Sequence, residues 1–350
     1  MIMLFVGIGL CGAALAWGVC SRMAAALFTV CFGAVFLMDQ AYYQNHLYLV
    51  LLFGLFFSVA DVDPKRMARR WMLDLARFQV AVVYIYGGIA KVNSDWLQGK
   101  PMSSWMALRA DWPLVGAVLE WPQTGVAMAW AGMLFDLLIV PLLLWRKTRS
   151  VAFAGVVVFH LFNALLFKIG VFPALMVVLT TLFFAPDWCE RRGRAAVAET
   201  RKLAVWVMPL VVLWMATQIV VPARSWFYDG HTSWTEEGHR FSWRMKLRSK
   251  VGRTVFHALD KEEGTHKVIE PQSEMGVYHA RKMATRPRLI LKYAHHLHQD
   301  LKNEGSGRWA VHADARAALN GRPVQTLIDP TVDLASQDIC GPATWIVPLQ

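Results

Sequence analysis

Long apolar blocks follow one another through the first 222 residues, and they constrain the fold more than any other feature of the sequence. A helix needs about 20 apolar residues to cross the hydrocarbon core of a bilayer. Hydrophobic residues make up 56% of the chain and charged residues 17%, which excludes an ordinary soluble globule. The pattern predicts an all-α polytopic membrane bundle of about eight spans. These are residues 2–20, 24–39, 46–60, 74–92, 123–145, 150–168, 171–186 and 203–222.

From residue 223 onward, charged residues are interspersed as in a water-soluble domain. Strand-like stretches occur at Phe241–Leu247 and Arg308–Ala313, with one helix expected between them. We therefore predict two domains. A transmembrane helical domain covers residues 1–222, and a small, mixed, β-containing extracytoplasmic domain covers residues 223–350.

The basic residues between the apolar blocks are distributed unevenly, which indicates how the chain crosses the membrane. One set of alternate loops carries thirteen lysines and arginines, and the other set carries three. The positive-inside rule places the richer set in the cytoplasm. The tail then lies on the outer side, which is the periplasm if the membrane is a bacterial inner membrane. The richer set is Arg22, Lys65, Arg66, Arg69, Arg70, Arg146, Lys147, Arg149, Arg191, Arg192, Arg194, Arg201 and Lys202; the poorer set is Lys100, Arg109 and Lys168.

The same alternation places the first residue outside, although no charged or polar stretch precedes the first span. An upstream helix missing from the sequence would explain this, so we expect the start to omit one span. The competing interpretation is a signal peptide over residues 1–20, but that stretch lacks the basic region with which such peptides begin.

Net charge, cysteines and histidines exclude other classes of protein. The net charge of +11 does not indicate nucleic-acid binding, because most basic residues of the first 222 positions lie in short membrane loops. The five cysteines are scattered over apolar blocks, a basic loop and the tail, so they predict no disulfide framework. His295, His296 and His298 occur on a charged segment, which favours a solvated helix face over a metal site.

An ionisable residue within a membrane span is costly and is a functional candidate by default. Lys91 ends the fourth span just after Gly87 and Gly88, which would allow a neighbouring helix to approach closely. Tyr84 lies two turns earlier on the same face. The alternative is a lysine that reaches the outer headgroups, with Trp96 as an interfacial anchor. A buried Lys91 would instead disfavour its ammonium form and act as a general base.

Further polar residues lie near the same outer boundary. Asn45 and His46 begin the third span, and His160 and Asn163 share one helical face that should point into the bundle. Each could also be structural, as a hydrogen-bonded interfacial histidine or as packing between helices. Asp136 in the fifth span could pair with one of these groups.

An aromatic-rich stretch, residues 232–245, begins the tail close to the membrane. It contains Trp234, Trp243 and Met245 and is either an interfacial belt or a first β-strand. Together with the preceding groups it gives the pattern of a site at the outer boundary, without naming a reaction.

These stretches are similar to motifs of the vitamin K-dependent γ-glutamyl carboxylase family, in the version with an HTTM-type membrane domain. Five motifs occur in the family's order over roughly residues 2–335. The chain departs from the family in lacking its first helix and in having a shorter tail than animal carboxylases, which use extra lumenal surface to hold a substrate propeptide. The resembling segments are the lysine segment 87–96, the Asn-His-x-Tyr motif at 45–48, the hairpin 160–172, the paired tryptophan motifs 233–235 and 241–245, and the stretch 319–323 with 329–333.

The resemblance implies an enzyme that couples oxygenation of a reduced naphthoquinone to its epoxide with carboxylation of protein glutamate. In the family, a lysine deprotonates vitamin K hydroquinone, which reacts with O2 to give a strong base. That base removes a γ-proton from glutamate, and the carbanion adds CO2. The implied partners are the lipid bilayer, an isoprenoid quinol and a glutamate-containing protein or peptide, and no metal is required.

The resemblance also implies roles for individual residues. Lys91 takes the role of the base, and His46 assists on the glutamate side. The implied quinone contacts are Asn45, Tyr84, His160 and Asn163. The implied substrate-side residues are Trp234, Trp243 and Met245.

Two other functions stay open. The main alternative is a quinone-binding membrane protein, or a quinol epoxidase, that lacks glutamate carboxylation. A transporter or lipid-binding membrane protein would show broken helices paired across two halves, and the sequence contains no such internal repeat.

Overall fold

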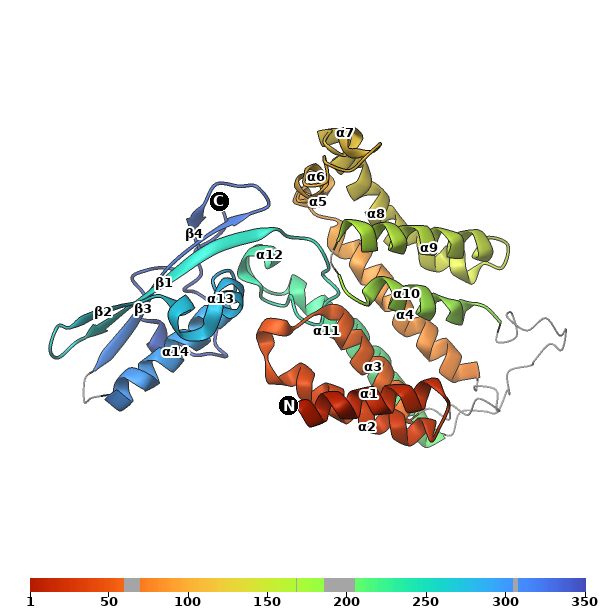
Figure 1. The fold of residues 1–350 in the computed structure, drawn as a ribbon, viewed down its shortest axis with the longest axis horizontal. Coiled ribbons are helices and arrows are strands. Elements are labelled where there is room, and N and C mark those ends of the chain that lie inside the picture. Colours follow the sequence, from red (N-terminus) through yellow and green to blue (C-terminus); the bar gives the residue numbers. More distant parts are fainter. Residues whose placement is uncertain (60–69, 168, 186–204, 305–307) are drawn as a thin grey trace.

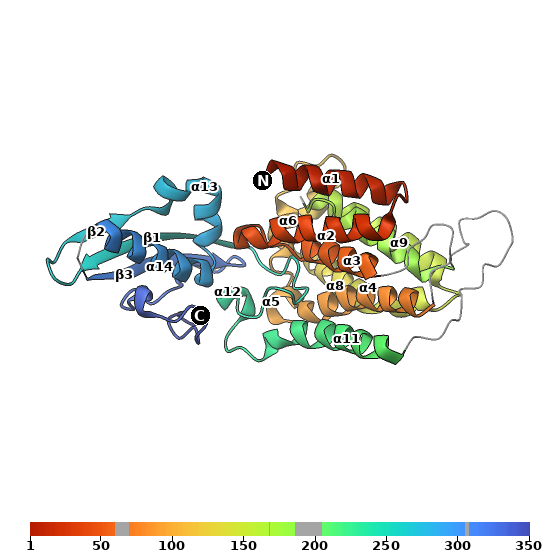
Figure 2. The same ribbon diagram turned by 90° about the horizontal axis from the view of Figure 1, so that it is seen from below.

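The computed structural model describes residues 1–59, 70–167, 169–185, 205–304 and 308–350. It consists of a bundle of apolar helices with a smaller sheet-containing domain beyond one end (Figures 1 and 2). The predicted loop residues Lys65, Arg66, Arg69, Lys168, Arg191, Arg192, Arg194, Arg201 and Lys202, and also Cys189, lie outside the described residues.

The bundle contains one apolar helix for each predicted span. Five of these helices are long and apolar enough to cross a membrane, and the other three are shorter. The described residues therefore support a multi-pass membrane bundle, with fewer full-length spans than the eight expected. The helices are α1 (Ile2–Ala16), α2 (Ser21–Met38), α3 (Asn45–Val59), α4 (Arg70–Lys91), α8 (Pro122–Leu144), α9 (Arg149–Leu166), α10 (Phe172–Thr180) and α11 (Met208–Ala223).

Apolar side chains on the outside of the bundle fit a lipid environment. Helix α1 buries none of its residues, and Leu10 is 68% exposed. Exposed apolar surface on this scale is unfavourable in water. The hydrocarbon core of a bilayer around the helices explains it. In Figures 1 and 2 the start of α1 lies at the end of the bundle that faces the sheet-containing domain.

Helix α4 is the most buried of the long helices and packs closely on α8. The predicted close approach at the glycine pair is confirmed. A methyl group on Gly88 would lie 2.7 Å from a side-chain atom of Leu137 and 3.1 Å from its backbone nitrogen. Only glycine leaves room for this contact, which brings the end of α4 against the middle of α8.

Three short helices connect α4 to α8 on the side of the sheet-containing domain. They are α5 (Ser94–Leu97), α6 (Met102–Ala107) and α7 (Gly116–Leu119). The side chain of Asn93 caps α5 by accepting a hydrogen bond from Trp96 N at 3.0 Å. This connection therefore forms an ordered layer between the bundle and the second domain.

The second domain is built on a four-stranded antiparallel sheet in the order β2-β1-β3-β4. The strands are β1 (Lys250–Asp260), β2 (His266–Ile269), β3 (Trp309–Leu319) and β4 (Gln325–Thr326). Helices α13 (Pro271–Met283) and α14 (Pro287–Glu304) follow β2. Alternate residues of β3 are buried and form the core with the apolar face of α14. The predicted mixed, β-containing domain is confirmed.

One predicted strand is wrong. Residues 241–247 form turns, and the strand begins three residues later, at Lys250. Phe241, Trp243 and Lys246 have φ angles of 58°, 56° and 53°, a left-handed backbone that cannot continue a strand. The second predicted stretch lies largely within β3, and two helices, instead of one, separate the strands.

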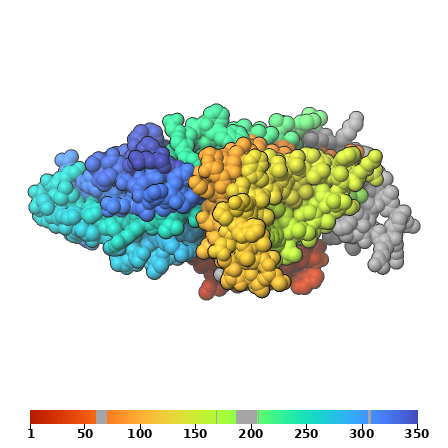
Figure 3. Space-filling view, turned by 90° about the horizontal axis from the view of Figure 1, so that it is seen from above, coloured from red at the N-terminus to blue at the C-terminus, as the bar shows by residue number. Residues whose placement is uncertain are grey.

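The bundle and the second domain meet at ordered contacts. Helix α11 ends at Ala223, next to the predicted boundary at residue 222. In the space-filling view the orange segment of the bundle borders directly on the blue end of the second domain (Figure 3). His279 of α13 contacts Asp39 at 2.9 Å, and Arg286 donates to Ala41 O at 3.1 Å.

Candidate functional site

A cavity of about 790 Å³ lies at this junction. Its inner part is apolar and is walled by α4, α8, α9 and α10. Its outer part is lined by residues 236–248, which follow the bundle, and by Arg286. The apolar wall consists of Val83, Phe135, Val158, Phe159, Phe162, Leu166, Phe167, Phe172 and Met176 among others.

The wall between α8 and α9 reaches the outer surface of the bundle. Val158 lines the cavity and is also 67% exposed, and Ala131 likewise lines the cavity and is exposed. Gly132 and Gly155 lie in the same wall, and a methyl group on either would meet neighbouring atoms only at 3.9 to 4.0 Å. The cavity is therefore thinly walled toward the space that lipid would occupy.

Lys91 and Asp136 form a buried ion pair on the cavity wall. Lys91 is 7% exposed and Asp136 is 6% exposed. The ammonium also donates to Gly87 O at 3.3 Å and lies 5.5 Å from the ring centre of Trp96. A methyl group on Gly87 would lie 3.2 Å from Asp136 Oδ2, so this glycine makes room for the carboxylate. Lys91 thus lies buried between α4 and α8.

Tyr84 and His160 form a second polar pair in the same cavity. The Tyr84 hydroxyl lies 2.9 Å from His160 Nε2, and both side chains are buried. His160 Nδ1 is buried without a hydrogen-bond partner among the described residues. Asn163, one turn along α9, donates to Phe159 O at 2.8 Å. A buried polar atom without a partner is costly, so this position suits a ligand group that can form a hydrogen bond.

Asn45 and His46 lie at the outer end of the cavity. Asn45 accepts a hydrogen bond from Tyr43 at 2.8 Å and donates to Arg244 O at 3.4 Å, which ties the start of α3 to the segment after the bundle. The ring of His46 is 6.0 Å from that of Phe172. Among the described residues His46 has no hydrogen-bond partner, so its ring nitrogens are available to a ligand.

The three predicted substrate-side residues are placed differently from one another. Met245 lines the cavity. Trp234 is fully buried in the core of the second domain and donates to Val347 O at 2.7 Å, and Trp243 is fully buried against Tyr48. The two tryptophans therefore hold the segment between them in place and do not line the cavity.

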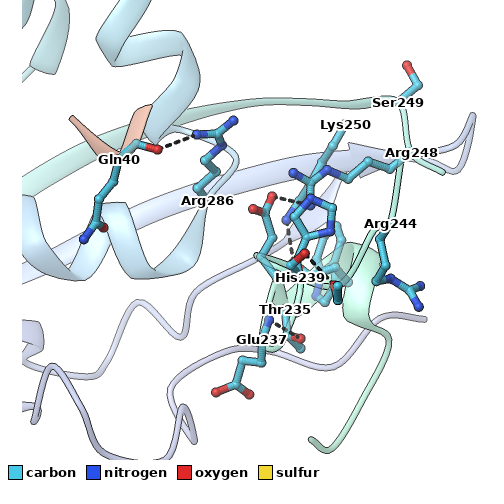
Figure 4. A network of polar contacts seen from close by, with 12 residues as sticks. Gln40, Thr235, Glu237, His239, Arg244, Arg248, Ser249, Lys250 and Arg286 are labelled. Carbon is cyan, nitrogen blue, oxygen red and sulfur yellow. Dashed lines mark hydrogen bonds and ion pairs between the residues drawn. The ribbon is translucent and has the colours of Figure 1, made fainter. Parts of the chain in front are cut away.

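A group of cations that the sequence analysis missed surrounds the outer end of the cavity. We call it the cationic mouth; it consists of Arg240, Arg244, Lys246, Arg248 and Arg286. Glu236 is the one carboxylate among the residues that line this end, and it pairs with Arg248 at 3.0 Å, although the angle is not that of a hydrogen bond. Figure 4 shows Arg244, Arg248 and Arg286 on different sides of His239, with Arg286 directed toward Gln40.

Burial, together with the crowding of like charges, perturbs the titration of groups in and beside the mouth. Burial, assisted by Arg248, lowers the pKa of Arg244 to about 10. Burial and the surrounding arginines lower the pKa of His239 well below its usual value, so this histidine is neutral. Burial is also the main cause that lowers the pKa of Lys250 to about 7. A mouth with this excess of cations favours an anionic ligand.

The sequence contains a run of basic residues here, but only the fold shows that they surround a cavity. Residues 240–250 contain five basic residues, and four of them line the cavity because left-handed turns fold the segment back over the bundle. The three histidines of α14 have separate partners: His295 contacts Gln337 O, His296 contacts Asp300 and His298 contacts Trp309 O.

The bundle and its cavity define a multi-pass membrane protein with a buried lysine–carboxylate pair and a cationic mouth. Residues 1–188 match the HTTM domain, and residues 203–350 match the vitamin K-dependent gamma-carboxylase lumenal domain. The chain belongs to the vitamin K-dependent gamma-carboxylase family. The second match begins before α11, so that helix falls within the lumenal-domain match. No solved structure matches the chain.

Proposed function

We propose that the chain is a γ-glutamyl carboxylase that couples conversion of a reduced vitamin K-type naphthoquinone to its epoxide with carboxylation of protein glutamate. One observation carries the proposal: a single cavity joins an apolar, bundle-enclosed part that contains Lys91 to a cationic mouth next to the second domain. A lipid-soluble co-substrate and a water-soluble anionic one could therefore meet in it. Membership of the carboxylase family supports this reading.

The inner cavity suits a hydroquinone with an isoprenoid tail. Apolar and aromatic side chains line it, and its polar groups are Lys91 with Asp136, Tyr84 with His160, and Asn163. Such a lining, with a few polar groups that fix orientation, is typical of small-molecule sites. His160 Nδ1, which lacks a partner, fits a ligand hydroxyl or carbonyl. The thin wall between α8 and α9 offers the tail a way to remain in the bilayer.

Asp136 is placed to accept the proton that Lys91 must lose before it can act as a base. A general base must be unprotonated, but a lysine in water at neutral pH carries its proton. In a dry apolar site, an ion pair is not clearly more stable than the neutral amine and neutral acid, because two full charges lose their hydration. We propose that Asp136 takes the lysine proton, which leaves the Lys91 amine free to accept one from a ligand hydroxyl.

The cationic mouth is the proposed site of the glutamate carboxylate. Arg240 and Arg244 lie on the cavity wall, and arginine binds carboxylates through two parallel hydrogen bonds. His46 lines the same outer end, and we propose that it assists on the glutamate side. When bound, reduced vitamin K with O2 supplies the strong base that removes the γ-proton, and CO2 is the carboxyl donor.

Enclosure of the inner cavity protects this chemistry from water. The strong base would be quenched by solvent before it reached the weakly acidic γ-carbon. Buried side chains enclose the site, among them Trp96 on the side of the second domain and Met176 of α10. The mouth segment, residues 236–248, follows Trp234, contains the buried Trp243 and covers the outer end.

The test uses the purified chain in nanodiscs with reduced vitamin K, O2, labelled bicarbonate and a glutamate-containing peptide. Epoxide formation and incorporation of label are followed together, with Lys91→Ala as the control. The proposal requires both products, and both must disappear in the variant. Epoxide without label would establish a quinol epoxidase without carboxylation. If neither product forms while the quinone still binds, the protein is a quinone-binding member of the family and the proposal fails.

A further inference from the structure

Asp95 forms the most completely hydrogen-bonded ion pair between the bundle and the second domain. Arg322 Nη1 and Nη2 donate to its two carboxylate oxygens at 2.8 and 2.7 Å, and Asn320 Nδ2 donates to Oδ2 at 2.8 Å. Asp95 is only 3% exposed. An arginine–carboxylate pair with two parallel hydrogen bonds fixes orientation as well as distance.

The second-domain side of this contact is a tight turn after β3. Asn320 and Gly321 have φ angles of 52° and 81°, a left-handed backbone that asparagine and glycine tolerate best. The turn presents Asn320 and Arg322 together. Asn320 also accepts a hydrogen bond from Ser249 N at 2.8 Å, so the same side chain holds the chain that leaves the cationic mouth.

The bundle side of the contact leads directly to the proposed base. Trp96, next to Asp95 in α5, is 2% exposed, lines the cavity and donates to Ala129 O of α8 at 2.7 Å. Its ring lies 5.5 Å from Lys91 Nζ. Asp95 and Trp96 are consecutive residues of the single helical turn α5.

We propose that Asp95, Asn320 and Arg322 form a positioning latch by which the second domain holds Trp96 against Lys91 and fixes the end of the mouth segment. The latch adds to the proposed function. It depends on that function only because it takes Lys91 to be the base. Two segments distant in the sequence, 93–97 and 319–323, thus act as one unit. The second domain contributes to proton transfer in the membrane without touching the reacting atoms.

The electrostatics support a contact that stays formed. Burial alone would raise the pKa of Asp95, but hydrogen bonds from Arg322 and Asn320 outweigh it and hold this pKa below the usual value. The carboxylate is therefore ionised throughout the physiological pH range. Loss of Arg322 would leave the Asp95 carboxylate buried with Asn320 as its remaining partner, which is more disruptive than loss of an exposed pair.

The test compares Arg322→Gln with Arg253→Gln. Arg253 also pairs with a carboxylate, Glu270, but both side chains are more than half exposed and lie far from the cavity wall. Two properties are measured: the steady-state rate of epoxide formation, and the pH dependence of Lys91 modification by an amine-reactive reagent, followed by mass spectrometry of the Lys91 peptide. Labelling of Lys91 does not depend on enzymatic activity.

We expect Arg322→Gln to shift the pH dependence of Lys91 labelling and to lower kcat for epoxide formation by roughly 10- to 100-fold, with KM for the quinol little changed. Arg253→Gln should leave both unchanged. Arg322→Lys keeps the charge but not the paired hydrogen bonds, so its labelling profile and kcat should be intermediate.

A folded Arg322→Gln protein whose Lys91 labelling matches the wild type would overturn the latch. If that variant does not fold, Asn320→Gly serves instead, because glycine tolerates the left-handed backbone and removes only the side-chain hydrogen bonds. A wild type that forms no epoxide, together with shifted labelling in the variant, would refute the proposed function and keep the latch.

Discussion

Lys91 of α4 and Asp136 of α8 meet as an ion pair in the wall of a cavity within the apolar bundle. The contact depends on Gly87 and Gly88, since a side chain at either would displace the carboxylate or the α8 backbone. Charge in hydrocarbon is costly, so a pair at this depth is expected to serve a function. It gives the proposed base a built-in proton acceptor, which a lysine at the headgroups would lack.

Asp136→Asn should abolish epoxide formation, with a loss of at least about 100-fold, because Lys91 then has no group to take its proton. Loss of one partner of a buried pair also destabilises by about 3 to 5 kcal/mol, so size-exclusion chromatography must first show a folded protein. Asp74→Asn on the exposed start of α4 is the matched control. Full activity in folded Asp136→Asn would show that Lys91 loses its proton elsewhere.

Gly155→Leu should raise KM for a long-chain quinol by about 10-fold and affect a quinol without a tail much less. The side chain would enter the wall between α8 and α9 from a position where added atoms meet no close contact. Initial rates with quinols of different tail length measure the effect. Gly12→Leu on α1, where a methyl group meets nothing within 4 Å, should change neither. Equal effects on both quinols would argue against a tail in this wall.

Arg244→Gln should raise KM for the glutamate peptide by about 10-fold while epoxide formation without peptide stays near the wild-type rate. A charge-assisted hydrogen bond to a carboxylate contributes about 1.5 to 3 kcal/mol. The same change should raise the melting temperature slightly, because it removes a buried charge crowded by Arg248. Arg281→Gln, at an exposed position on α13, is the control. An unchanged peptide KM would place the glutamate elsewhere.

The lowered pKa of Lys250 predicts that folding stability depends on pH. Its pKa is about 7 in the folded protein, below the value of about 10.4 for a free lysine. The unfolded chain therefore binds this proton more tightly, and folding stability should rise as the pH increases from about 7 to about 10. Melting temperatures across this range should rise less in Lys250→Met than in the wild type. Lys292→Met, at an exposed position on α14, should behave as the wild type does.

The loop charges predict that the second domain lies outside the cytoplasm. Cys340 in that domain and Cys20 between α1 and α2 are both exposed, and the prediction puts them on opposite sides of the membrane. In spheroplasts, a membrane-impermeant maleimide should label a variant that keeps only Cys340 and spare one that keeps only Cys20. The reverse pattern would invert the topology.

Lys91, Tyr84, His46 and His160 could be found from the sequence because ionisable and polar side chains stand out within apolar spans. All four line the same cavity. Asp136 was noticed, but its partner was not, because residues 45 positions apart on different helices meet only through the packing of α4 on α8. The cationic mouth was missed because residues 241–247 read as a strand, whereas left-handed turns at Phe241, Trp243 and Lys246 bend them over the bundle.

The sequence by itself determined the apolar spans, the soluble tail and the family, since these follow from local composition, periodicity and short motifs. Only the tertiary structure decided which charges meet. The pairing of Lys91 with Asp136, and of Asp95 with Arg322 across 227 positions, depends on how separate elements pack. Side-chain hydrogen bonds and ion pairs act over a few ångströms, and no local pattern in the chain specifies which distant residues come that close.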